Sequence, residues 1–387
     1  MRVTIVSRIY RPEPASASFF LGSVADALLA DGHHVDVLTA RLPRGMRPEQ
    51  RGERVRTFPV LRDRNGYVRG YLPYLSFDIP VAFRLLFARR PDVVLVEPPP
   101  TTGAAVRVIC AIRGLPYVYD AADIWADAAS MATGSGTVIR ILRSVERFAM
   151  RGAAHLVTIS QEVKDRVRDL DVGRPVTVTG FGADTSEFSV TEAAPAPVFV
   201  YAGSYSAWHG ADVLLKALAD LRATHPDHTL RIIGNGDRAA LEARARELGV
   251  HDAVQFLEPV TPAELAPHLA EAVATVATLK PGTGYDYAFT SKVYSSLAAG
   301  CPAVFAGPGP TAAFLDEANR HVRAGAAVAY GPGAIATAMR FFADNRLTPA
   351  EREALGVWTA AEHSMSAVAH RVAAVVEDVA SAARRRR

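Results

Sequence analysis

The sequence is poor in cysteine and lysine, and it contains no long apolar run. Its two cysteines, Cys110 and Cys301, match no spacing that is typical of a metal or redox site. We therefore expect two reduced thiols, as in a cytoplasmic protein. No stretch of about 18 apolar residues is present, so the sequence predicts no membrane-spanning helix. Lysine is rare enough to draw interest wherever it occurs: Lys164, Lys216, Lys280 and Lys292.

Two common nucleotide-binding fingerprints are also missing. The loop after the first apolar run, Ser7–Ser18, has no GxGxxG motif, and neither Gly134–Gly136 nor Gly234–Gly236 completes one. This argues against a nicotinamide or flavin enzyme. The absence of a Walker motif argues against a P-loop NTPase.

Basic and acidic residues are nearly equal in number. A net charge of +3 is too small to indicate a nucleic-acid partner. The one basic block is Arg384–Arg387, for which a solvated tail is the main interpretation and an anionic membrane surface the alternative. The N-terminal apolar run is too short for a signal peptide and is interrupted by Arg8, so we expect a strand there.

Short runs rich in valine, isoleucine and leucine alternate with helical stretches along the whole chain. Such runs are typical of parallel strands that are covered by helices on both faces. A length of 387 residues favours two domains, so we predict an α/β protein with two doubly wound, Rossmann-like sheets. The expected strands are Val3–Ser7, Val35–Thr39, Val93–Glu97, Tyr117–Asp120, Leu156–Ser160, Val176–Thr179, Val198–Ala202, Leu230–Gly234, Val254–Leu257, Val273–Leu279, Ala303–Ala306 and Ala327–Tyr330.

A polar, proline-bearing segment, Ser189–Pro197, marks the boundary between the domains. We predict a first domain at residues 1–190 and a second at 197–359. A C-terminal helix within 360–387 is expected to pack back on the first domain. Because ligands of such sheets bind at the carboxyl ends of the strands, functional residues are expected in the loops that follow them.

The segment Thr290–Val304, TSKVYSSLAAGCPAV, combines a Thr-Ser helix start with a lysine in the first turn. Backbone N–H groups at a helix start have no partner within the helix, and the helix dipole favours an anion there. Lys292 adds a full positive charge. The segment therefore predicts a phosphate-binding site.

Seven segments follow one another along the chain in an order that is typical of a known protein family. They are Arg8–Thr39, Asp120–Asp127, Arg151–Val163, Gly180–Phe188, Tyr201–Leu218, Arg231–Asp237 and Ser291–Val304. Their order and spacing resemble the GT-B glycosyltransferases of family 4, particularly the branch that builds bacterial polysaccharides and antibiotic sugars. The resemblance covers nearly the whole chain.

The resemblance implies two Rossmann-like domains with a cleft between them, an acceptor on the N-terminal domain and a nucleotide-sugar donor on the C-terminal one. It also implies retaining transfer with no metal and no further cofactor. Asp169 and Asp171 form the DxD sequence of metal-dependent transferases, but they end a helix before Gly173, so we expect no metal site. The sequence offers no Ser-His-Asp or Cys-His arrangement, which fits an acceptor whose proton is taken by the departing phosphate.

For the donor phosphates, the resemblance implies contacts from Lys292, Ser291 and the loop at Gly284. Ser204 and His209 stand where family members often have an arginine and a lysine. His209 offers a hydrogen bond or, if protonated, a charge, and an ordinary loop histidine is the alternative.

For the donor sugar and ribose, the family uses two glutamates eight positions apart. These positions fall on Tyr287, next to Asp286, and on Ser295, so both glutamates are missing and Asp286 is the nearby carboxylate. A serine lacks the charge-assisted hydrogen bond of a carboxylate. The nucleobase is expected near Gly234, Gly236 and Pro259, although glycines that serve only a tight turn are an equal alternative.

On the acceptor side, Asp123 falls on the aspartate of a family His-Asp pair and is expected to act on an acceptor hydroxyl. Helix capping before Trp125 is its alternative role. The other expected acceptor-side residues are Ala17, Ser18, Glu97 and Asp120.

The stretch Arg62–Phe77 interleaves arginines with aromatic residues. A weak peripheral membrane contact is one interpretation. A packed surface helix with arginine stems lying along it is the other.

Three functions remain open. The leading hypothesis is a retaining, metal-independent transferase that moves a UDP- or GDP-linked sugar to an oxygen, nitrogen or sulfur nucleophile of a polysaccharide or secondary-metabolite acceptor. The second is a non-catalytic nucleotide-sugar-binding or partner protein, because the two glutamates are missing. The third, a nucleotide-sugar epimerase, needs an acid–base carboxylate and histidine that the sequence does not supply near the donor site. The oligomeric state does not follow from the sequence.

Overall fold

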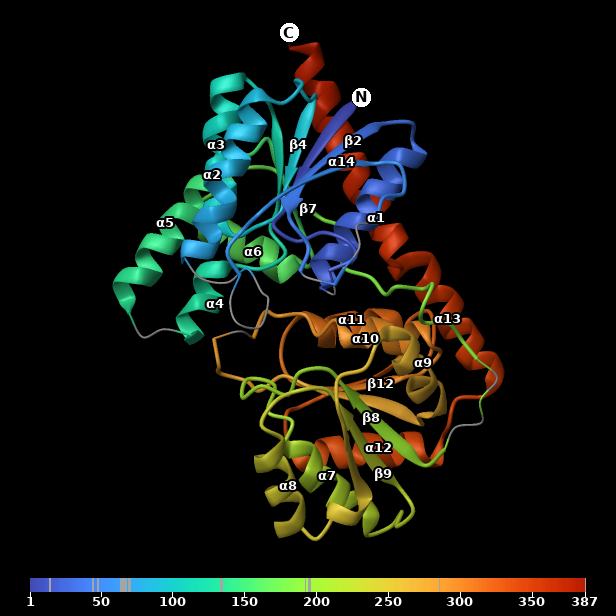
Figure 1. Cartoon of the computed structure of the whole chain (residues 1–387). Helices are drawn as coiled ribbons and strands as arrows, with labels where there is room; N and C mark the ends of the chain where they lie inside the picture. The colour runs from blue at the N-terminus through green and yellow to red at the C-terminus, as the bar shows by residue number, and fades with distance from the viewer. Residues whose placement is uncertain are drawn as a thin grey trace. The chain divides into compact units, whose positions relative to one another are not determined.

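The computed structural model describes every residue except 14, 44, 47–48, 63–67, 69–70, 133–134, 192, 194–195, 285 and 387. Its contacts divide the chain into two units: unit 1, Met1–Gly180 with Val368–Arg387, and unit 2, Phe181–Ala367. Each unit is a parallel sheet with helices packed on it (Figure 1). This is the fold class that the alternating apolar runs predict.

Unit 1 has a 7-stranded sheet in the order β3-β2-β1-β4-β5-β6-β7. The strand order reverses between β1 and β4, which is the switch point of a doubly wound sheet. The strands are β1 (Arg2–Val6), β2 (His34–Ala40), β3 (Arg54–Phe58), β4 (Val93–Val96), β5 (Tyr117–Asp120), β6 (His155–Thr158) and β7 (Val176–Val178). The helices are α1 (Ser16–Ala30), α2 (Tyr71–Phe87), α3 (Pro100–Arg113), α4 (Trp125–Ala132), α5 (Gly136–Gly152), α6 (Gln161–Asp169) and α14 (Met365–Arg385).

Unit 2 repeats this plan with a 6-stranded sheet in the order β10-β9-β8-β11-β12-β13. Its switch point lies between β8 and β11. The strands are β8 (Val198–Ala202), β9 (Thr229–Ile233), β10 (Val254–Leu257), β11 (Ala274–Thr278), β12 (Ala303–Ala306) and β13 (Gly325–Val328). The helices are α7 (Val213–Arg222), α8 (Arg238–Glu247), a short 3-10 turn (His251–Ala253), α9 (Pro262–Glu271), α10 (Lys292–Ala298), α11 (Pro310–Ala318), α12 (Pro332–Asp344) and α13 (Pro349–His363).

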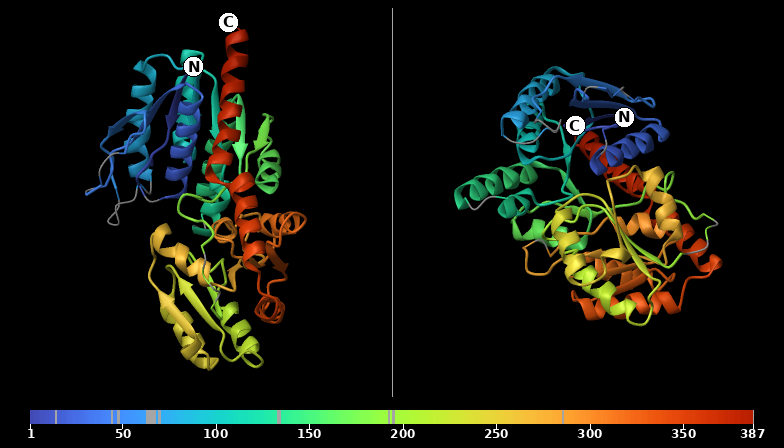
Figure 2. Two further views of the ribbon diagram at one scale, coloured as in Figure 1. Left: turned by 90° about the vertical axis from the view of Figure 1, so that its right-hand side faces the viewer. Right: turned by 60° about the horizontal axis from the view of Figure 1, so that its bottom comes forward.

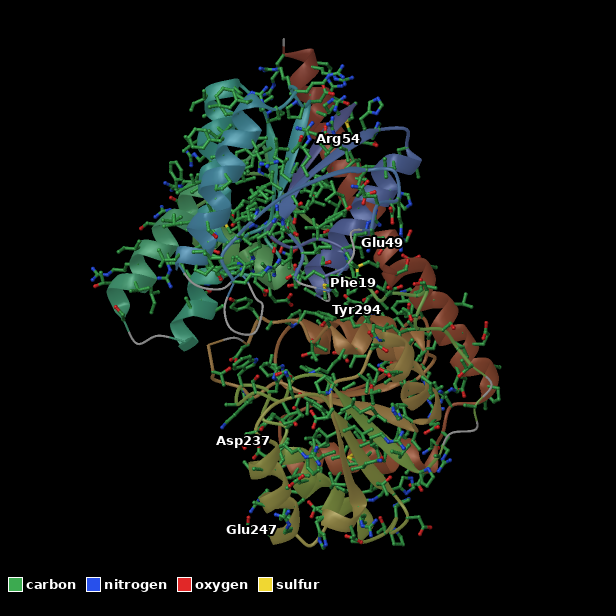
Figure 3. All side chains as sticks on the ribbon, viewed as in Figure 1. Phe19, Glu49, Arg54, Asp237, Glu247 and Tyr294 are labelled. Atoms are coloured by element: carbon green, nitrogen blue, oxygen red, sulfur yellow. The ribbon has the colours of Figure 1, made fainter. Side chains whose placement is uncertain are left out.

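The central strands of unit 2 are buried along their whole length. All five residues of β8 and of β11 are buried, because helices cover both faces of the sheet. One apolar cluster is built around α7 and α12, with Leu218 and Met339 among its members. A second cluster joins α9 and α10, with Leu269 and Tyr294. Figure 3 shows the side chains that fill these layers.

The structure corrects two strand expectations. β13 ends at Val328, two residues before the predicted end, and β3 at Arg54–Phe58 was not expected. β3 pairs with β2 as a terminal strand of the sheet and is only partly buried. Its sequence, RVRTF, therefore carries two arginines instead of the continuous apolar run of a central strand.

The boundary between the units lies earlier than the sequence places it. We expected a first domain that ends at residue 190, whereas unit 2 begins at Phe181. Phe188 is buried in the cluster that includes Tyr294, and Ala183 forms a bridge to Ser364. These tertiary contacts assign residues 181–190 to unit 2. Residues 192 and 194–195 of the predicted linker lie outside the described residues.

The end of the chain is divided differently as well. α13 and residues up to Ala367 belong to unit 2, and unit 1 takes the chain from Val368 instead of residue 360. α14 runs along unit 1 (Figure 2). Glu377 bonds to His33 at 2.6 Å, and Arg384 forms an ion pair with Asp92 at 2.8 Å.

The absence of a membrane-spanning helix, expected from the sequence, is confirmed for the described part of the chain. Of the stretch Arg62–Phe77, for which the sequence left a peripheral membrane contact open, residues 63–67 and 69–70 lie outside the described residues.

Candidate functional site

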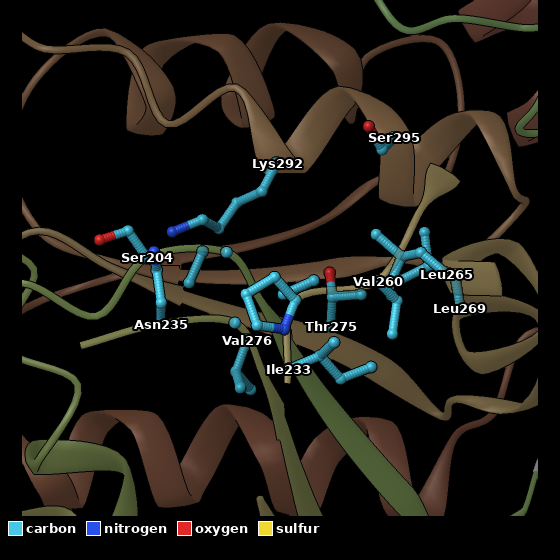
Figure 4. A pocket seen from close by; sticks show the side chains of 15 residues that line it. Ser204, Ile233, Asn235, Val260, Leu265, Leu269, Thr275, Val276, Lys292 and Ser295 are labelled. Atoms are coloured by element: carbon cyan, nitrogen blue, oxygen red, sulfur yellow. The ribbon is translucent and has the colours of Figure 1, made fainter. Parts of the chain in front are cut away.

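Unit 2 contains a pocket of about 210 Å³ between its sheet and helices α9 and α10 (Figure 4). The chain leaves β8 through Ala202–Ser204 and leaves β9 through Ile233–Asn235, and both segments line the pocket. β11 contributes Thr275–Ala277 from the neighbouring strand. The pocket thus lies at the switch point, where sheets of this kind bind ligands.

The two ends of the pocket differ in polarity. Figure 4 shows Ser204, Asn235 and the Lys292 side chain at one end. At the other end the α9 residues Leu265 and Leu269 form an apolar wall. The arrangement suits a ligand with an anionic part and a flat, less polar part.

Lys292 is the one charged side chain among the described residues that line this pocket. Its Nζ donates to the Tyr201 hydroxyl at 3.1 Å and lies 4.4 Å from the centre of the Tyr201 ring. It forms no ion pair with a described carboxylate. Burial lowers the pKa of Lys292 to about 7. A half-buried ammonium without a counter-ion is stabilised by an anionic ligand.

A short chain of hydrogen bonds connects this lysine to the loop after β8. Tyr201 Oη, which accepts from Lys292, donates to the Ser204 carbonyl at 2.7 Å. The Ser204 hydroxyl lies 2.8 Å from that of Ser206. The contacts hold the lysine and the loop in one arrangement at the polar end.

Glycines let the two strand-end loops approach closely. Gly234 has φ of 146°, and a Cβ there would lie 2.1 Å from the Gly203 carbonyl oxygen. The N–H of Gly203 donates to Ile233 and that of Gly234 to Leu257. A Cβ on Gly236 would lie 2.2 Å from the Tyr205 ring. These contacts support the structural interpretation of Gly234 and Gly236.

The start of α10 differs from the expected cap. Ser291 has helical backbone angles, and its side chain makes no capping bond. The N–H groups of Val293 and Tyr294 donate to the carbonyls of Thr290 and Ser291. α10 has only seven residues. The predicted Thr-Ser cap is therefore wrong, and the positive charge at the pocket comes from the lysine itself.

In unit 1, three acidic residues lie at the carboxyl ends of β4 and β5. Glu97 is buried and accepts from the Ser7 hydroxyl at 2.9 Å. Burial raises the pKa of Glu97 to about 7, with a smaller contribution from Asp123. Burial and repulsion from Glu97 and Asp123 raise the pKa of Asp120 to about 8. Asp123 itself is exposed.

Helix capping at the start of α4 is supplied by another residue. The N–H groups of Trp125 and Ala126 donate to the two carboxylate oxygens of Glu146, at 2.7 and 3.1 Å. Glu146 lies on α5 and is fully buried. These bonds show that Glu146 contributes a cap at the start of α4.

Two family models match consecutive parts of the chain. Residues 18–182 match the glycosyl transferase 4-like domain, and residues 196–345 match glycosyl transferases group 1. The chain belongs to the family 4 glycosyltransferases.

Individual relatives and structures agree with this assignment. A D-inositol 3-phosphate glycosyltransferase of Corynebacterium aurimucosum is 29% identical over 175 residues, which cover 40% of this chain and 40% of the relative. The alignment therefore spans less than half the length of that relative. The enzyme of the same name from Corynebacterium jeikeium is 26% identical over 344 residues, which cover 79% and 80%. Sucrose-phosphate synthase (tll1590) from Thermosynechococcus elongatus has a TM-score of 0.73 at 17% identity, covers 98% and 99%, and shares the GT-B fold.

The pocket of this glycosyltransferase contains part of the expected donor set. Among its lining residues are Ser204, Gly234, Pro259, Lys292 and Ser295. The following expected residues are not among them: His209, Gly236, Gly284, Asp286, Tyr287 and Ser291.

Two of these other residues have local interactions. The Asp286 carboxylate accepts from the N–H of Gly282 at 3.1 Å, within its own loop. Burial, with a smaller contribution from Lys292, lowers the pKa of His209 to about 4. The uncharged form of His209 is therefore favoured near neutral pH, which favours a hydrogen bond over a charge at this position.

Sequence reasoning missed Tyr201, Asn235 and the apolar wall on α9. Tyr201 lies within the buried strand β8, where an aromatic residue is typical of a core position, and it contacts Lys292 from 91 positions away. Asn235 lies between the two glycines that drew notice, so its position could have been flagged. Leu265 and Leu269 follow ordinary helical spacing and gave no signal.

Proposed function

We propose that this chain is a retaining, metal-independent glycosyltransferase. It moves a sugar from a UDP- or GDP-linked donor to a hydroxyl, amine or thiol of a polysaccharide or secondary-metabolite acceptor. The observation that carries the proposal is the pocket of unit 2, where Lys292 has no carboxylate partner among the described residues. A nucleoside diphosphate supplies the anion that such a site needs.

In this proposal the diphosphate occupies the polar end and bonds to Lys292. Ser295 lies one helical turn further along α10 and meets a ribose hydroxyl. The base lies toward Pro259 and Leu265 at the apolar end. Hydrogen bonds from uncharged side chains take the place of those that the family usually makes from carboxylates to the sugar and the ribose.

Charge develops on the departing diphosphate as the glycosidic bond breaks. The Lys292 ammonium stabilises that charge. The departing phosphate takes the acceptor proton, so no enzymic nucleophile is required. On unit 1, Asp123 orients the acceptor hydroxyl, with the protonated form of Glu97 or Asp120 as a hydrogen-bond donor.

Thermal shift measurements with UDP, GDP, ADP and dTDP test the donor site. We expect one nucleotide, at about 100 times its dissociation constant, to raise the melting temperature by several degrees. Lys292→Met should abolish that shift. Lys216→Met is the matched control, because Lys216 is exposed on α7 and pairs only with Asp220 among the described residues.

The same preparation separates the alternatives. Failure of every nucleotide to shift the wild-type protein would contradict the proposal. A nucleotide shift without transfer to any acceptor, D-inositol 3-phosphate included, favours the non-catalytic protein. An epimerase is less well supported, since the described lining residues include no carboxylate or histidine. Solvent deuterium entering the donor sugar would favour it.

A further inference from the structure

Tyr201 has a hydroxyl group in a part of the sheet that needs only apolar side chains. It lies in β8, where all five residues are buried, and Tyr201 itself is 0% exposed. The preceding residues of the strand, Val198, Phe199 and Val200, are apolar. A buried hydroxyl costs stability unless it is hydrogen-bonded, whereas phenylalanine would fill nearly the same space without that cost. The hydroxyl therefore has to be understood from its partners.

The Tyr201 hydroxyl makes two hydrogen bonds of opposite direction. It donates its single proton to the Ser204 carbonyl at 2.7 Å and accepts a bond from Lys292 Nζ at 3.1 Å. An ammonium group has only donors, so it bonds to a lone pair of the hydroxyl oxygen. Burial raises the pKa of Tyr201 far above its usual value, which keeps the proton on the phenol. The Ser204 carbonyl thus orients the hydroxyl so that a lone pair faces the lysine.

Other contacts restrict the Lys292 side chain. Its Nζ lies 4.4 Å from the centre of the Tyr201 ring, a distance typical of a cation–π contact. The stem passes close to the backbone of Gly203, where a Cβ would lie 3.0 Å from Lys292 Cε. A lysine side chain loses much conformational entropy when it becomes ordered. Because these contacts already order Lys292, less of that cost falls on ligand binding.

Two of the three ammonium donors of Lys292 are left for a ligand. One N–H goes to Tyr201, and the described residues offer Nζ no other hydrogen bond and no ion pair. Lys292 and Ser204 line the same pocket, and Figure 4 shows the lysine side chain reaching toward Ser204 at the polar end. An anion at that end therefore meets an ammonium that other contacts already hold in position.

We propose that Tyr201 is a positioning residue of the anion site in unit 2. Its hydroxyl, oriented by the Ser204 carbonyl, holds the Lys292 ammonium so that the two remaining N–H groups bind the diphosphate of the donor. The identity of the anion rests on the proposed function, whereas the hold on the lysine does not. Two competing roles give different results in the experiment: a ring that serves only as packing, and a hydroxyl that competes with the ligand for the lysine.

Tyr201→Phe removes the hydroxyl and keeps the ring. We expect this variant to bind UDP or GDP, whichever the wild type binds, about tenfold more weakly, because Lys292 loses the contact that orders it. Inorganic pyrophosphate should lose a similar factor, because it has the anionic part of the ligand without the base. Isothermal titration calorimetry measures both affinities.

Tyr330→Phe is the matched control in the same unit. The Tyr330 hydroxyl donates to the Gly210 carbonyl at 2.9 Å, and Tyr330 is not among the residues that line the pocket. This variant should bind both probes as the wild type does. A similar loss of affinity in both variants would show that removal of either tyrosine hydroxyl weakens the unit, and would overturn the proposal.

The titration of Lys292 gives a readout that needs no ligand. Lysine is rare in this chain, so an NMR spectrum of protein that carries isotope-labelled lysine is simple, and Lys292→Met identifies the signal. Burial lowers the pKa of Lys292 to about 7. A hydrogen bond to the charged form favours that form, so Tyr201→Phe should lower the titration midpoint further, by about one pH unit. Tyr330→Phe should leave the midpoint unchanged.

The titratable groups beside Lys292 keep their charge in this range. Tyr201 stays protonated, and burial, with a smaller contribution from Lys292, lowers the pKa of His209 to about 4. A shift of the midpoint near pH 7 therefore reports on the lysine itself. A merely structural tyrosine would leave it in place.

The outcomes separate this inference from the proposed function. An unchanged midpoint or an unchanged affinity in Tyr201→Phe would overturn the inference and leave the tyrosine as packing. Tighter binding of either probe would overturn it in favour of competition for the lysine. A wild-type protein that binds no nucleotide would contradict the proposed function, and a lowered midpoint in Tyr201→Phe would still support the hold of Tyr201 on Lys292.

Discussion

Lys292 combines a cost in stability with a proposed role in donor binding. In the unfolded chain its pKa is about 10.5, and in the folded chain it is about 7. Between these values the unfolded state binds more protons, so this residue makes stability rise with pH from about 7 to about 10. At neutral pH and below, the folded protein therefore carries a half-buried charge that lacks a counter-ion among the described residues.

Replacing that lysine should stabilise the unliganded protein. We expect Lys292→Met to raise the free energy of unfolding of unit 2 at pH 7 by on the order of 2 kcal/mol, because methionine fills the space without a charge. The gain should shrink as the pH rises toward 10. Urea unfolding between pH 6 and 10 measures it. A variant less stable than wild type at pH 7 would show that the ammonium is well solvated.

The carboxyl group of Asp120 gives the opposite dependence. Its pKa is raised to about 8 in the folded protein, so the folded state binds more protons between about 4 and 8 and stability is lost as pH rises through that window. Asp120→Asn should therefore stabilise unit 1 by on the order of 2 kcal/mol at pH 8, and much less at pH 4. Chemical denaturation at the two pH values tests this. Equal effects at both would indicate that Asp120 is already ionised at pH 4.

At the scale of elements, the loops after β8 and β9 depend on their glycines. We expect Gly234→Ala to cost about 2 to 4 kcal/mol, because its Cβ would collide with the Gly203 carbonyl and its φ disfavours a side chain. It should also weaken nucleotide binding, since both loops line the pocket. Gly249→Ala is the control: its φ is 68°, but nothing lies within 4 Å, so about 1 kcal/mol is expected. Equal costs for the two would contradict the close approach.

At the scale of the whole molecule, the last helix of the chain belongs to the first sheet. α14 buries Val368, Val372 and Val376 in unit 1. We expect Val372→Asp to lower the unfolding temperature of unit 1 by about 10 °C, because it buries an unpaired charge. Calorimetry with saturating nucleotide, which should stabilise unit 2 alone, assigns the transitions. A fall confined to the nucleotide-responsive transition would contradict the packing.

Local sequence pattern predicts some features of this protein, and long-range packing decides others. The sequence alone determined the two parallel α/β sheets and most strand positions, because buried parallel strands require continuous apolar runs. It also singled out Lys292, because lysine is rare in this sequence. It did not determine β3, whose mixed composition suits a terminal strand.

Contacts between distant residues were decided by the tertiary structure. Tyr201, which contacts Lys292, and Glu146, which caps α4, come from other elements, so the local sequence spacing does not predict these contacts. α2 has large apolar residues on opposite sides, and its packing against α3 and β2 leaves Phe77 and Val81 buried while Ile79 and Phe83 are exposed. Periodicity fixes which residues share a face, and the neighbour that covers a face fixes which one remains exposed.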